Sequence, residues 1–263
     1  MIVTLLTDFG TADYFVGAMK GALLTVNPRA QMVDITHEIA PHDVEAGAFT
    51  LLAAFDAFPA GTIHVAVVDP GVGSSRRAVV VESERHTFVG PDNGVFGYVY
   101  ERAGALRVFH VTNEKYFRTP VSATFHGRDI FAPVAGALSL GVPPEEFGPE
   151  ITDFVRLPFA APQRRPDGTL VATVIHVDRF GNCVTNISPR DLGEESIKRG
   201  VRLIVGDREV RCFRRFFGEE GGTAGEPFAI WGSTGLLELA VFRDSAARVL
   251  GAKRGQRVEV KRQ

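Results

Sequence analysis

Two aspartates stand directly after apolar runs that are typical of buried strands. Asp8 follows the run "IVTLLT", and Asp69 follows "TIHVAVV". The carboxyl ends of parallel strands meet at one edge of an open α/β sheet, and ligands bind beyond that edge. We therefore predict a pocket that contains both carboxylates, with turn formation or helix capping as the alternative for each. Asp13 lies near a predicted helix start, where capping would also explain it.

The loop that begins at Asp69 reads "DPGVGSSRR". It is not a phosphate loop, because Arg76 stands where the dinucleotide fingerprint needs its third glycine and no Gly-Lys-Ser/Thr follows. The next residues are apolar and extended, so no helix N-terminus is available to receive a phosphate. We predict a rigid hairpin that turns Arg76 back toward Asp69. This pair is either part of a site or an ordinary ion pair across the hairpin.

The stretch "TFHGRDIFAP" (124–133) gathers polar side chains before a predicted helix. His126 is followed by Gly127, which allows close approach, and by Arg128 and Asp129. Near the Asp69 pair, His126 could polarise or position a water molecule, whereas a lone histidine is more often structural.

No metal site is predicted. The candidate segment "THEIAPH" has His37 and His42 five residues apart with a proline between them. A zinc helix needs two histidines four residues apart on one face.

Two stretches in the second half of the chain suit a nucleoside and an amino acid. In "VDRFGNCVTNI", Asp178 and Asn182 flank Phe180. An aromatic ring can stack on a purine while an amide binds the base edge, although an ordinary turn is the alternative. In "WGSTGLLELA", Ser233 and backbone amides at a glycine-rich bend suit an amino-acid carboxylate or amine.

Apolar periodicity predicts how these residues are positioned. Strands are expected at 2–7, 31–36, 62–68, 78–82, 86–89 and 107–112, and helices at 13–28, 43–58 and near 129–140. Asp43 is the expected N-cap of the second helix. The alternation of strand and helix predicts an α/β N-terminal domain with a mostly parallel, helix-covered sheet.

The second half of the chain has a different pattern. A Pro-rich segment is followed by short strand-like runs without a long helix between them. We therefore predict an α/β domain over 1–157, a linker over 158–168, and an all-β, barrel-like domain over 169–263.

Composition narrows the class of protein. The chain has 263 residues, 45% hydrophobic residues and a net charge of −2, which favours a globular protein without nucleic-acid partners. Cys183 and Cys212 make no disulfide framework. We see neither a signal peptide nor an apolar run long enough for a bilayer, so we expect a cytoplasmic protein with no membrane partner.

Taken together, five motifs resemble those of one family, in the same order along nearly the whole chain. They are "TDFG…D", "VVDPGVG…RR", "TFHGRDIFAP", "DRFGNCVTNI" and "GSTGLLELA". The family is the S-adenosylmethionine hydroxide adenosyltransferases, relatives of the fluorinating and chlorinating enzymes. The resemblance implies hydrolysis of S-adenosylmethionine to adenosine and methionine without a cofactor. It also implies a β-barrel C-terminal domain and a homotrimer whose site lies between one subunit's N-terminal domain and its neighbour's C-terminal domain.

The resemblance also implies roles for individual residues. Asp69, Arg76 and His126 match the triad that activates water. Asp8 is expected to hold the ribose hydroxyls. The remaining expected contacts are Asp13, Asp178 and Ser233 with the methionine amino-acid group, and Phe180, Asn182 and Phe217 with adenine.

Three positions depart from the halogenating relatives. Those relatives carry an aromatic residue at the position of Asp69, a serine at that of Gly127 and a tryptophan at that of His42. These differences disfavour halide transfer. A halogenase and a non-catalytic S-adenosylmethionine- or adenosine-binding module are the alternatives to a hydrolase.

Overall fold

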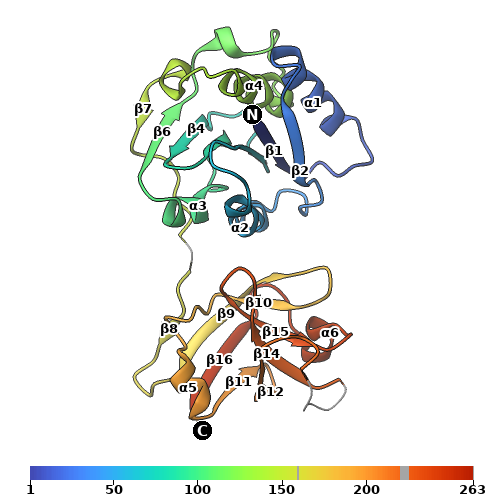
Figure 1. The fold of residues 1–263 in the computed structure, drawn as a ribbon, viewed down its shortest axis with the longest axis vertical. Coiled ribbons are helices and arrows are strands. Elements are labelled where there is room, and N and C mark those ends of the chain that lie inside the picture. The colour runs from blue at the N-terminus through green and yellow to red at the C-terminus, as the bar shows by residue number, and fades with distance from the viewer. Residues whose placement is uncertain (159, 220–224, 263) are drawn as a thin grey trace. The chain divides into compact units, whose positions relative to one another are not determined.

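The chain forms two compact units, Met1–Pro158 and Phe159–Gln263 (Figure 1). The computed structural model describes residues 1–158, 160–219 and 225–262. Each unit buries a hydrophobic core of its own. The predicted linker, 158–168, contains a short strand, β8 (Gln163–Arg164), which pairs with β9 (Leu170–Val177) of the second unit.

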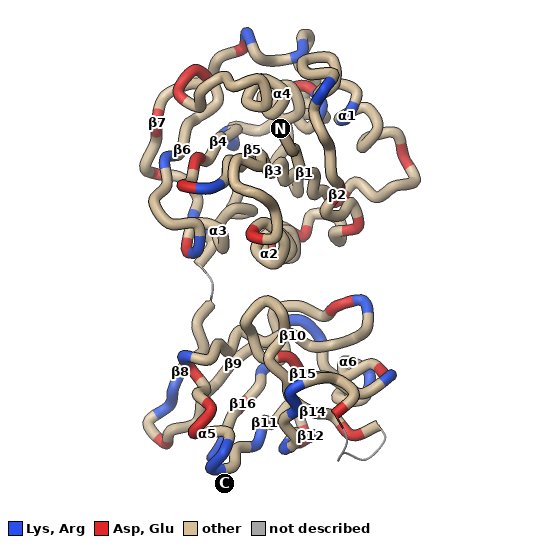
Figure 2. Tube along the Cα trace, viewed as in Figure 1, with Lys and Arg blue, Asp and Glu red and all other residues tan. Residues whose placement is uncertain are grey.

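A seven-stranded sheet forms the centre of the first unit, in the order β2-β1-β3-β5-β4-β6-β7. Its strands are β1 (Ile2–Thr7), β2 (Gln31–Thr36), β3 (Ile63–Val67), β4 (Ala78–Ser83), β5 (Thr87–Pro91), β6 (Leu106–His110) and β7 (Glu150–Ile151). The pairs β1–β2, β1–β3 and β3–β5 are parallel, and β4 pairs antiparallel with β5 and β6. The central strands β1, β3 and β5 carry no charged residue, as a sheet covered on both faces requires (Figure 2).

Helices cover both faces of this sheet. Apolar residues of α1 (Phe15–Val26) and α4 (Ala132–Ser139) enter one core cluster, and those of α2 (Val44–Ala54) and α3 (Gly97–Arg102) enter another. Short 3-10 turns lie at Phe55–Ala57, Glu114–Tyr116 and Pro144–Phe147, and a π-helical turn at Gly127–Phe131 leads into α4.

The N-termini of α1 and α2 show whether Asp13 and Asp43 cap these helices. The Asp43 carboxylate accepts a hydrogen bond from the Ala46 N–H at 3.0 Å, so the predicted cap of α2 is confirmed. Helix α1 begins at Phe15 without a side-chain cap, so the capping interpretation of Asp13 is wrong.

The predicted hairpin between β3 and β4 is also wrong. These strands are not neighbours in the sheet, because β5 lies between them and pairs in parallel with β3 (Val65 opposite Val89). The segment 68–77 is therefore a crossing connection to the far side of β5. The hairpin prediction failed because two apolar runs joined by a turn do not by themselves specify that the two strands pair with each other.

The second unit is a strongly curved, almost entirely antiparallel sheet. Its order is β12-β11-β16-β9-β10-β15-β14-β13, with β8 attached to β9. Besides β8 and β9, the strands are β10 (Cys183–Thr185), β11 (Val201–Val205), β12 (Arg208–Val210), β13 (Cys212–Arg214), β14 (Pro227–Trp231), β15 (Leu237–Val241) and β16 (Arg257–Arg262). The two ends of the order, β12 and β13, are separated in the chain by Arg211 alone, which brings the sheet close to a closed barrel. Short helices α5 (Glu194–Lys198) and α6 (Ala246–Leu250) complete the unit.

Within the described ranges, no helix combines the length and the apolar character needed to cross a membrane.

Two histidines of the first unit, His64 and His86, are buried. His64 on β3 lies among aromatic rings, with His86 at 5.0 Å between ring centroids, and burial followed by the charge of His86 lowers the pKa of His64 to about 3. Burial also lowers the pKa of His86. In the unfolded chain these imidazoles titrate near pH 6.5, so the unfolded state takes up protons first as the pH falls.

We predict that the free energy of unfolding is constant above about pH 6.5 and falls below it, by up to about 1.4 kcal/mol per pH unit for each histidine. Urea denaturation between pH 7.5 and pH 5 measures this slope. His64→Asn can keep the hydrogen bond that Thr4 Oγ1 makes with His64 Nδ1 (2.7 Å) but cannot titrate, so its slope should be shallower. Equal slopes in the two proteins would contradict this explanation.

Candidate active site

A cavity of about 290 Å³ opens at the carboxyl ends of β1 and β3 in the first unit. Two predicted acids, Asp8 and Asp69, line it together with His126. Its remaining walls are mainly apolar and include Phe9, Phe15, Pro41, His42, Val67, Val72, Thr124, Phe125 and Gly127. The predicted pocket at this sheet edge therefore exists, and it joins residues that are more than a hundred positions apart in the chain.

Arg76 connects Asp69 and His126 on the cavity wall. Its Nε lies 2.9 and 3.1 Å from the two carboxylate oxygens of Asp69, and one terminal nitrogen makes a further short contact with that carboxylate. The same terminal nitrogen lies 2.8 Å from His126 Nδ1. The guanidinium packs over the Phe131 ring, and the Arg76 and Asp69 side chains are 10% and 6% exposed. Arg76 thus lies behind Asp69 and His126 and fixes both.

This arrangement sets the protonation of His126. A guanidinium only donates hydrogen bonds, so His126 Nδ1 must accept and the neutral ring carries its proton on Nε2. Burial and then the positive charge of Arg76 lower the pKa of His126 below its ordinary value. At neutral pH the ring is therefore neutral and its Nε2–H can donate a hydrogen bond.

The loops that carry Arg76 and His126 touch directly. Gly73 has φ +77°, and a Cβ at this position would lie 2.2 Å from the carbonyl oxygen of Ala123. Only glycine satisfies both the backbone angle and this close approach. The sequence "DPGVG" therefore shapes one loop so that the loop bearing His126 can lie against it.

Asp129 holds the second loop in place. Its carboxylate is fully buried and accepts hydrogen bonds from Arg128 Nε (2.6 Å), the Ser122 N–H (2.9 Å) and Arg118 (3.2 Å). Although burial opposes ionisation, these bonds lower the pKa of Asp129. Asp129 lies in the π-helical turn Gly127–Phe131, which directly follows His126, and it binds Ser122 on the other side, so it fixes the segment on both sides of His126.

Asp8 is anchored by a strained neighbour. The Asp8 carboxylate accepts the His42 backbone N–H at 2.8 Å, and His42 has φ +68°, an uncommon angle for a residue other than glycine. One side of the carboxylate is thereby oriented, while its remaining lone pairs are available to a ligand.

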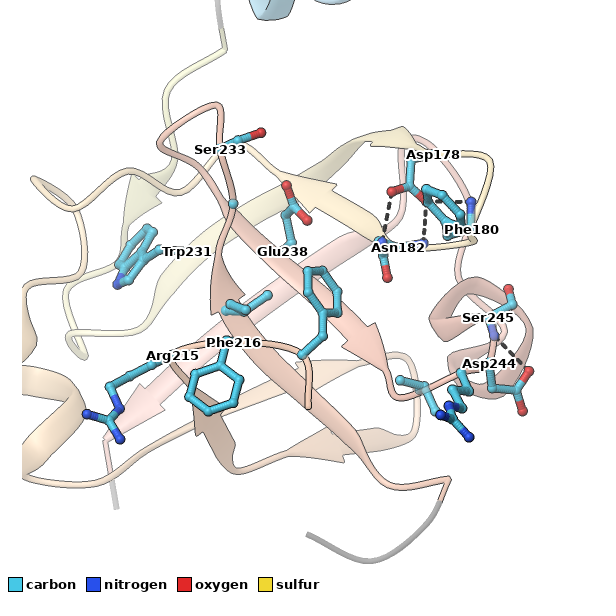
Figure 3. A pocket seen from close by; sticks show the side chains of 15 residues that line it. Asp178, Phe180, Asn182, Arg215, Phe216, Trp231, Ser233, Glu238, Asp244 and Ser245 are labelled. Atoms are coloured by element: carbon cyan, nitrogen blue, oxygen red, sulfur yellow. Dashed lines mark hydrogen bonds between the residues drawn. The ribbon is translucent and has the colours of Figure 1, made fainter. Parts of the chain in front are cut away.

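The second unit contains a larger pocket of about 910 Å³ (Figure 3). The predicted residues Asp178, Phe180, Asn182, Phe217 and Ser233 all line it. Lining residues that the sequence did not single out are Arg215, Phe216, Ile230, Trp231, Gly232, Glu238, Val241, Arg243, Asp244 and Ser245. Strong exposure of Phe180 (78%) leaves its ring free to stack on a ligand.

Asp178 organises one wall of this pocket. One carboxylate oxygen accepts the N–H groups of Phe180 (2.9 Å) and Asn182 (2.8 Å), and the other accepts the Asn182 side-chain amide at 2.8 Å. Because that amide nitrogen must donate to Asp178, the Asn182 side-chain oxygen remains as an acceptor. Gly181 (φ +83°) completes the turn against Ser245, whose Oγ would lie 2.1 Å from an added Cβ.

Asp13 is the predicted site residue that lies apart from these pockets. It is exposed and lines neither the 290 Å³ cavity nor the 910 Å³ pocket.

The described residues contain no cluster of three or more His, Cys, Asp or Glu side chains suited to a metal ion.

Comparison with known proteins assigns both units to one family. Residues 3–148 match the SAM hydroxide adenosyltransferase N-terminal domain, and residues 172–259 match the C-terminal domain of the same name. The chain belongs to the SAM hydroxide adenosyltransferase family.

Individual proteins are similar to this chain over most of its length. An (R)-S-adenosyl-L-methionine hydrolase from Thermus thermophilus is 40% identical to this chain over 267 residues, covering 98% of each protein. A crystal structure of an uncharacterized conserved protein from Thermotoga maritima has a TM-score of 0.91 and 36% identity, with full coverage of both chains. A fluorinase from Actinoplanes is more distant, at 27% identity over 270 residues, covering 91% of this chain and 90% of the fluorinase. The predicted two-domain fold class is confirmed.

For this SAM hydroxide adenosyltransferase we predict that Arg76→Met raises the pKa of His126, because the variant removes a positive charge and leaves the negative charge of Asp69 nearby. Titration of the histidine ring signals by NMR measures the shift. Arg77→Met is the control. Arg77 is bound to Asp92 and Asp153, and burial and then the charge of Arg77 lower the pKa of His110. That variant should therefore shift His110 and leave His126 unchanged. An unchanged His126 in Arg76→Met would show that burial alone sets its pKa.

Proposed function

We propose that this protein hydrolyses S-adenosylmethionine to adenosine and methionine. The observation that carries the proposal is the Asp69–Arg76–His126 arrangement on the wall of the sheet-edge cavity. It supplies a carboxylate that can accept a proton and a neutral imidazole that can donate a hydrogen bond, at one small apolar cavity. The name of the Thermus thermophilus relative supports the same activity.

The reaction is a displacement at the ribose 5′ carbon. The oxygen of a water molecule forms the new bond to this carbon while the carbon–sulfur bond breaks and its electron pair passes to sulfur. The sulfonium leaves as a neutral thioether, so the leaving group needs no general acid. What the site must supply is an oriented nucleophile and shelter from bulk water.

Each residue of the cavity has its own role in this reaction. Asp69 accepts the proton that the attacking water loses, and the Nε2–H of His126 orients the water oxygen. Arg76 orients the Asp69 carboxylate and keeps His126 neutral, and its charge stabilises hydroxide character in the transition state. Asp8 holds the ribose hydroxyls through the lone pairs that His42 leaves free.

The pocket of the second unit holds the two ends of the substrate. Phe180 and Phe217 stack on adenine, and the Asn182 side-chain oxygen accepts from its amino group. Ser233 and Asp178 bind the amino-acid group, with Asp13 contributing to the same group. No cofactor or metal ion is required, because the sulfonium is already an activated leaving group.

Since the substrate-binding residues are divided between the two units, we further propose a cytoplasmic homotrimer. In it, the first unit of one subunit and the second unit of a neighbour form each site, without nucleic-acid or membrane partners. Light scattering combined with an activity assay tests the assembly. A monomer with full activity would contradict it.

Halide transfer is the second candidate function, since fluorinases are relatives of this chain. A serine in place of Gly127 would bring a Cβ to 3.3 Å from the Phe9 ring and 3.4 Å from the Phe125 ring, so it would require these rings to move. The carboxylate of Asp69 would also repel an incoming halide. Chromatography of reactions with S-adenosylmethionine, with and without chloride or fluoride, distinguishes adenosine from a halogenated nucleoside. No product under any of these conditions would favour a binding module without catalysis.

We predict that Asp69→Ala, Arg76→Ala and His126→Ala each raise the activation barrier by about 2–4 kcal/mol. The single-turnover rate should fall accordingly, while S-adenosylmethionine affinity stays close to that of the wild type. These three side chains act on the attacking water molecule and do not bind the adenine, ribose or methionine parts of the substrate. The triple variant should be little slower than the slowest single variant, because the three act as one unit. If Arg76→Ala melts early yet turns over normally, the Asp69–Arg76 contact is only a structural ion pair.

We predict that Asp8→Ala weakens adenosine binding without unfolding the first unit. Hydrogen bonds to a charged group contribute about 1.5–3 kcal/mol each, and two ribose hydroxyls share this carboxylate. Calorimetric titration with adenosine measures the loss, and 2′,3′-dideoxyadenosine is the control ligand, since its affinity should not change. Unaltered adenosine affinity would remove Asp8 from the ribose site.

A further inference from the structure

Glu238 is a buried acid on the wall of the larger pocket that the roles above do not use. It is the second residue of β15, opposite Ile230 on β14 and Val184 on β10, and is 9% exposed. Its carboxylate lies over the bend that carries Ser233, because a Cβ on Gly232 would be 1.8 Å from Glu238 Oε1. Figure 3 shows it between the Ser233 bend and the Asp178 turn.

The described part of the chain offers this carboxylate no hydrogen bond and no ion pair. Two arginines line the same pocket, but each is engaged elsewhere: Arg215 binds Glu219 at 3.0 Å, and Arg243 packs on the Phe242 ring. Burial, and then the negative charge of Asp178, raise the pKa of Glu238. A buried acid without a partner is costly in free energy, so a cationic ligand that pairs with it gains more than it would at an exposed acid.

We propose that Glu238 is a substrate-binding residue whose carboxylate accepts hydrogen bonds from the primary ammonium group of the substrate's amino-acid part. The inference rests on the proposed function and adds the residue that distinguishes an amino-acid-bearing nucleoside from a simple one.

The chemistry of the pocket favours the ammonium group over the other parts of the substrate. An ammonium donates three hydrogen bonds. The pocket offers three acceptors: Glu238 on β15, the Ser233 hydroxyl on the bend and a free lone pair of Asp178 on the turn. A sulfonium has no N–H or O–H donor to satisfy a carboxylate. The adenine amino group is already matched by Asn182, and the ring nitrogens of adenine are acceptors that an ionised Glu238 would repel.

The test uses two stable thioethers that share the nucleoside and differ in the amino-acid part, S-adenosyl-L-homocysteine and 5′-methylthioadenosine. Calorimetry gives the affinity of each for the wild type, for Glu238→Gln and for the control Glu209→Gln, an exposed acid on β12. We expect Glu238→Gln to weaken S-adenosyl-L-homocysteine about 10- to 100-fold, as for loss of one charged hydrogen-bonding partner, and to leave 5′-methylthioadenosine within twofold. Glu209→Gln should change neither affinity.

Each other result overturns the proposal. Unchanged affinity for both ligands means that Glu238 does not bind substrate, and equal loss for both means that it acts on the nucleoside or on the fold. If Glu238→Gln does not fold, Glu238→Asp replaces it, and the shortened acid should still weaken only S-adenosyl-L-homocysteine.

A separate assay of adenosine release from S-adenosylmethionine by the wild type tests the proposed function. If Glu238→Gln selectively loses S-adenosyl-L-homocysteine binding while the wild type releases no adenosine from S-adenosylmethionine, the ammonium site stands and the hydrolase proposal is refuted. If the wild type releases adenosine but Glu238→Gln shows no selective loss, the hydrolase proposal stands and the ammonium site is refuted.

Discussion

The guanidinium of Arg76 is the contact on which the candidate active site depends. It binds both oxygens of Asp69 and the Nδ1 of His126, and so ties the loop after β3 to the loop before α4. One cation therefore has two effects. It orients the carboxylate by hydrogen bonds and, together with burial, disfavours positive charge on the imidazole, which places a carboxylate and a neutral hydrogen-bond donor side by side on the cavity wall.

Much of the surrounding structure keeps this contact in place. The parallel strands β1 and β3 deliver Asp8 and Asp69 to one sheet edge, and their uncharged sequences are buried between two helical layers. Gly73 allows the two loops to touch, and the buried Asp129 fixes the loop of His126. In the second unit an aspartate again organises polar groups, since Asp178 orders its own turn by hydrogen bonds. Both pockets thus rely on a carboxylate that is satisfied by its own protein.

The sequence predicted the strands and helices of the first unit well, because apolar runs and helical spacing are local signals. It also predicted which acids lie at the sheet edge, since parallel strands have a common carboxyl end. It did not predict that β5 would lie between β3 and β4, because strand order depends on long-range pairing that no short motif encodes. Glu238 was missed for a similar reason. An acid inside the apolar run "LLELAV" is typical of the exposed face of a strand, and only the bend at Gly232 shows that this position is covered.

The turn at Asp178 has a consequence for the choice of base. By accepting the amide nitrogen of Asn182, Asp178 prevents that side chain from rotating to present its NH₂ group to the pocket. A 6-amino purine placed there meets an oxygen that complements it, whereas a 6-oxo purine brings two carbonyl oxygens face to face, with no second rotamer to relieve the repulsion. Deamination of the base, a change of one exocyclic group, would therefore weaken the binding of the purine proposed for this pocket.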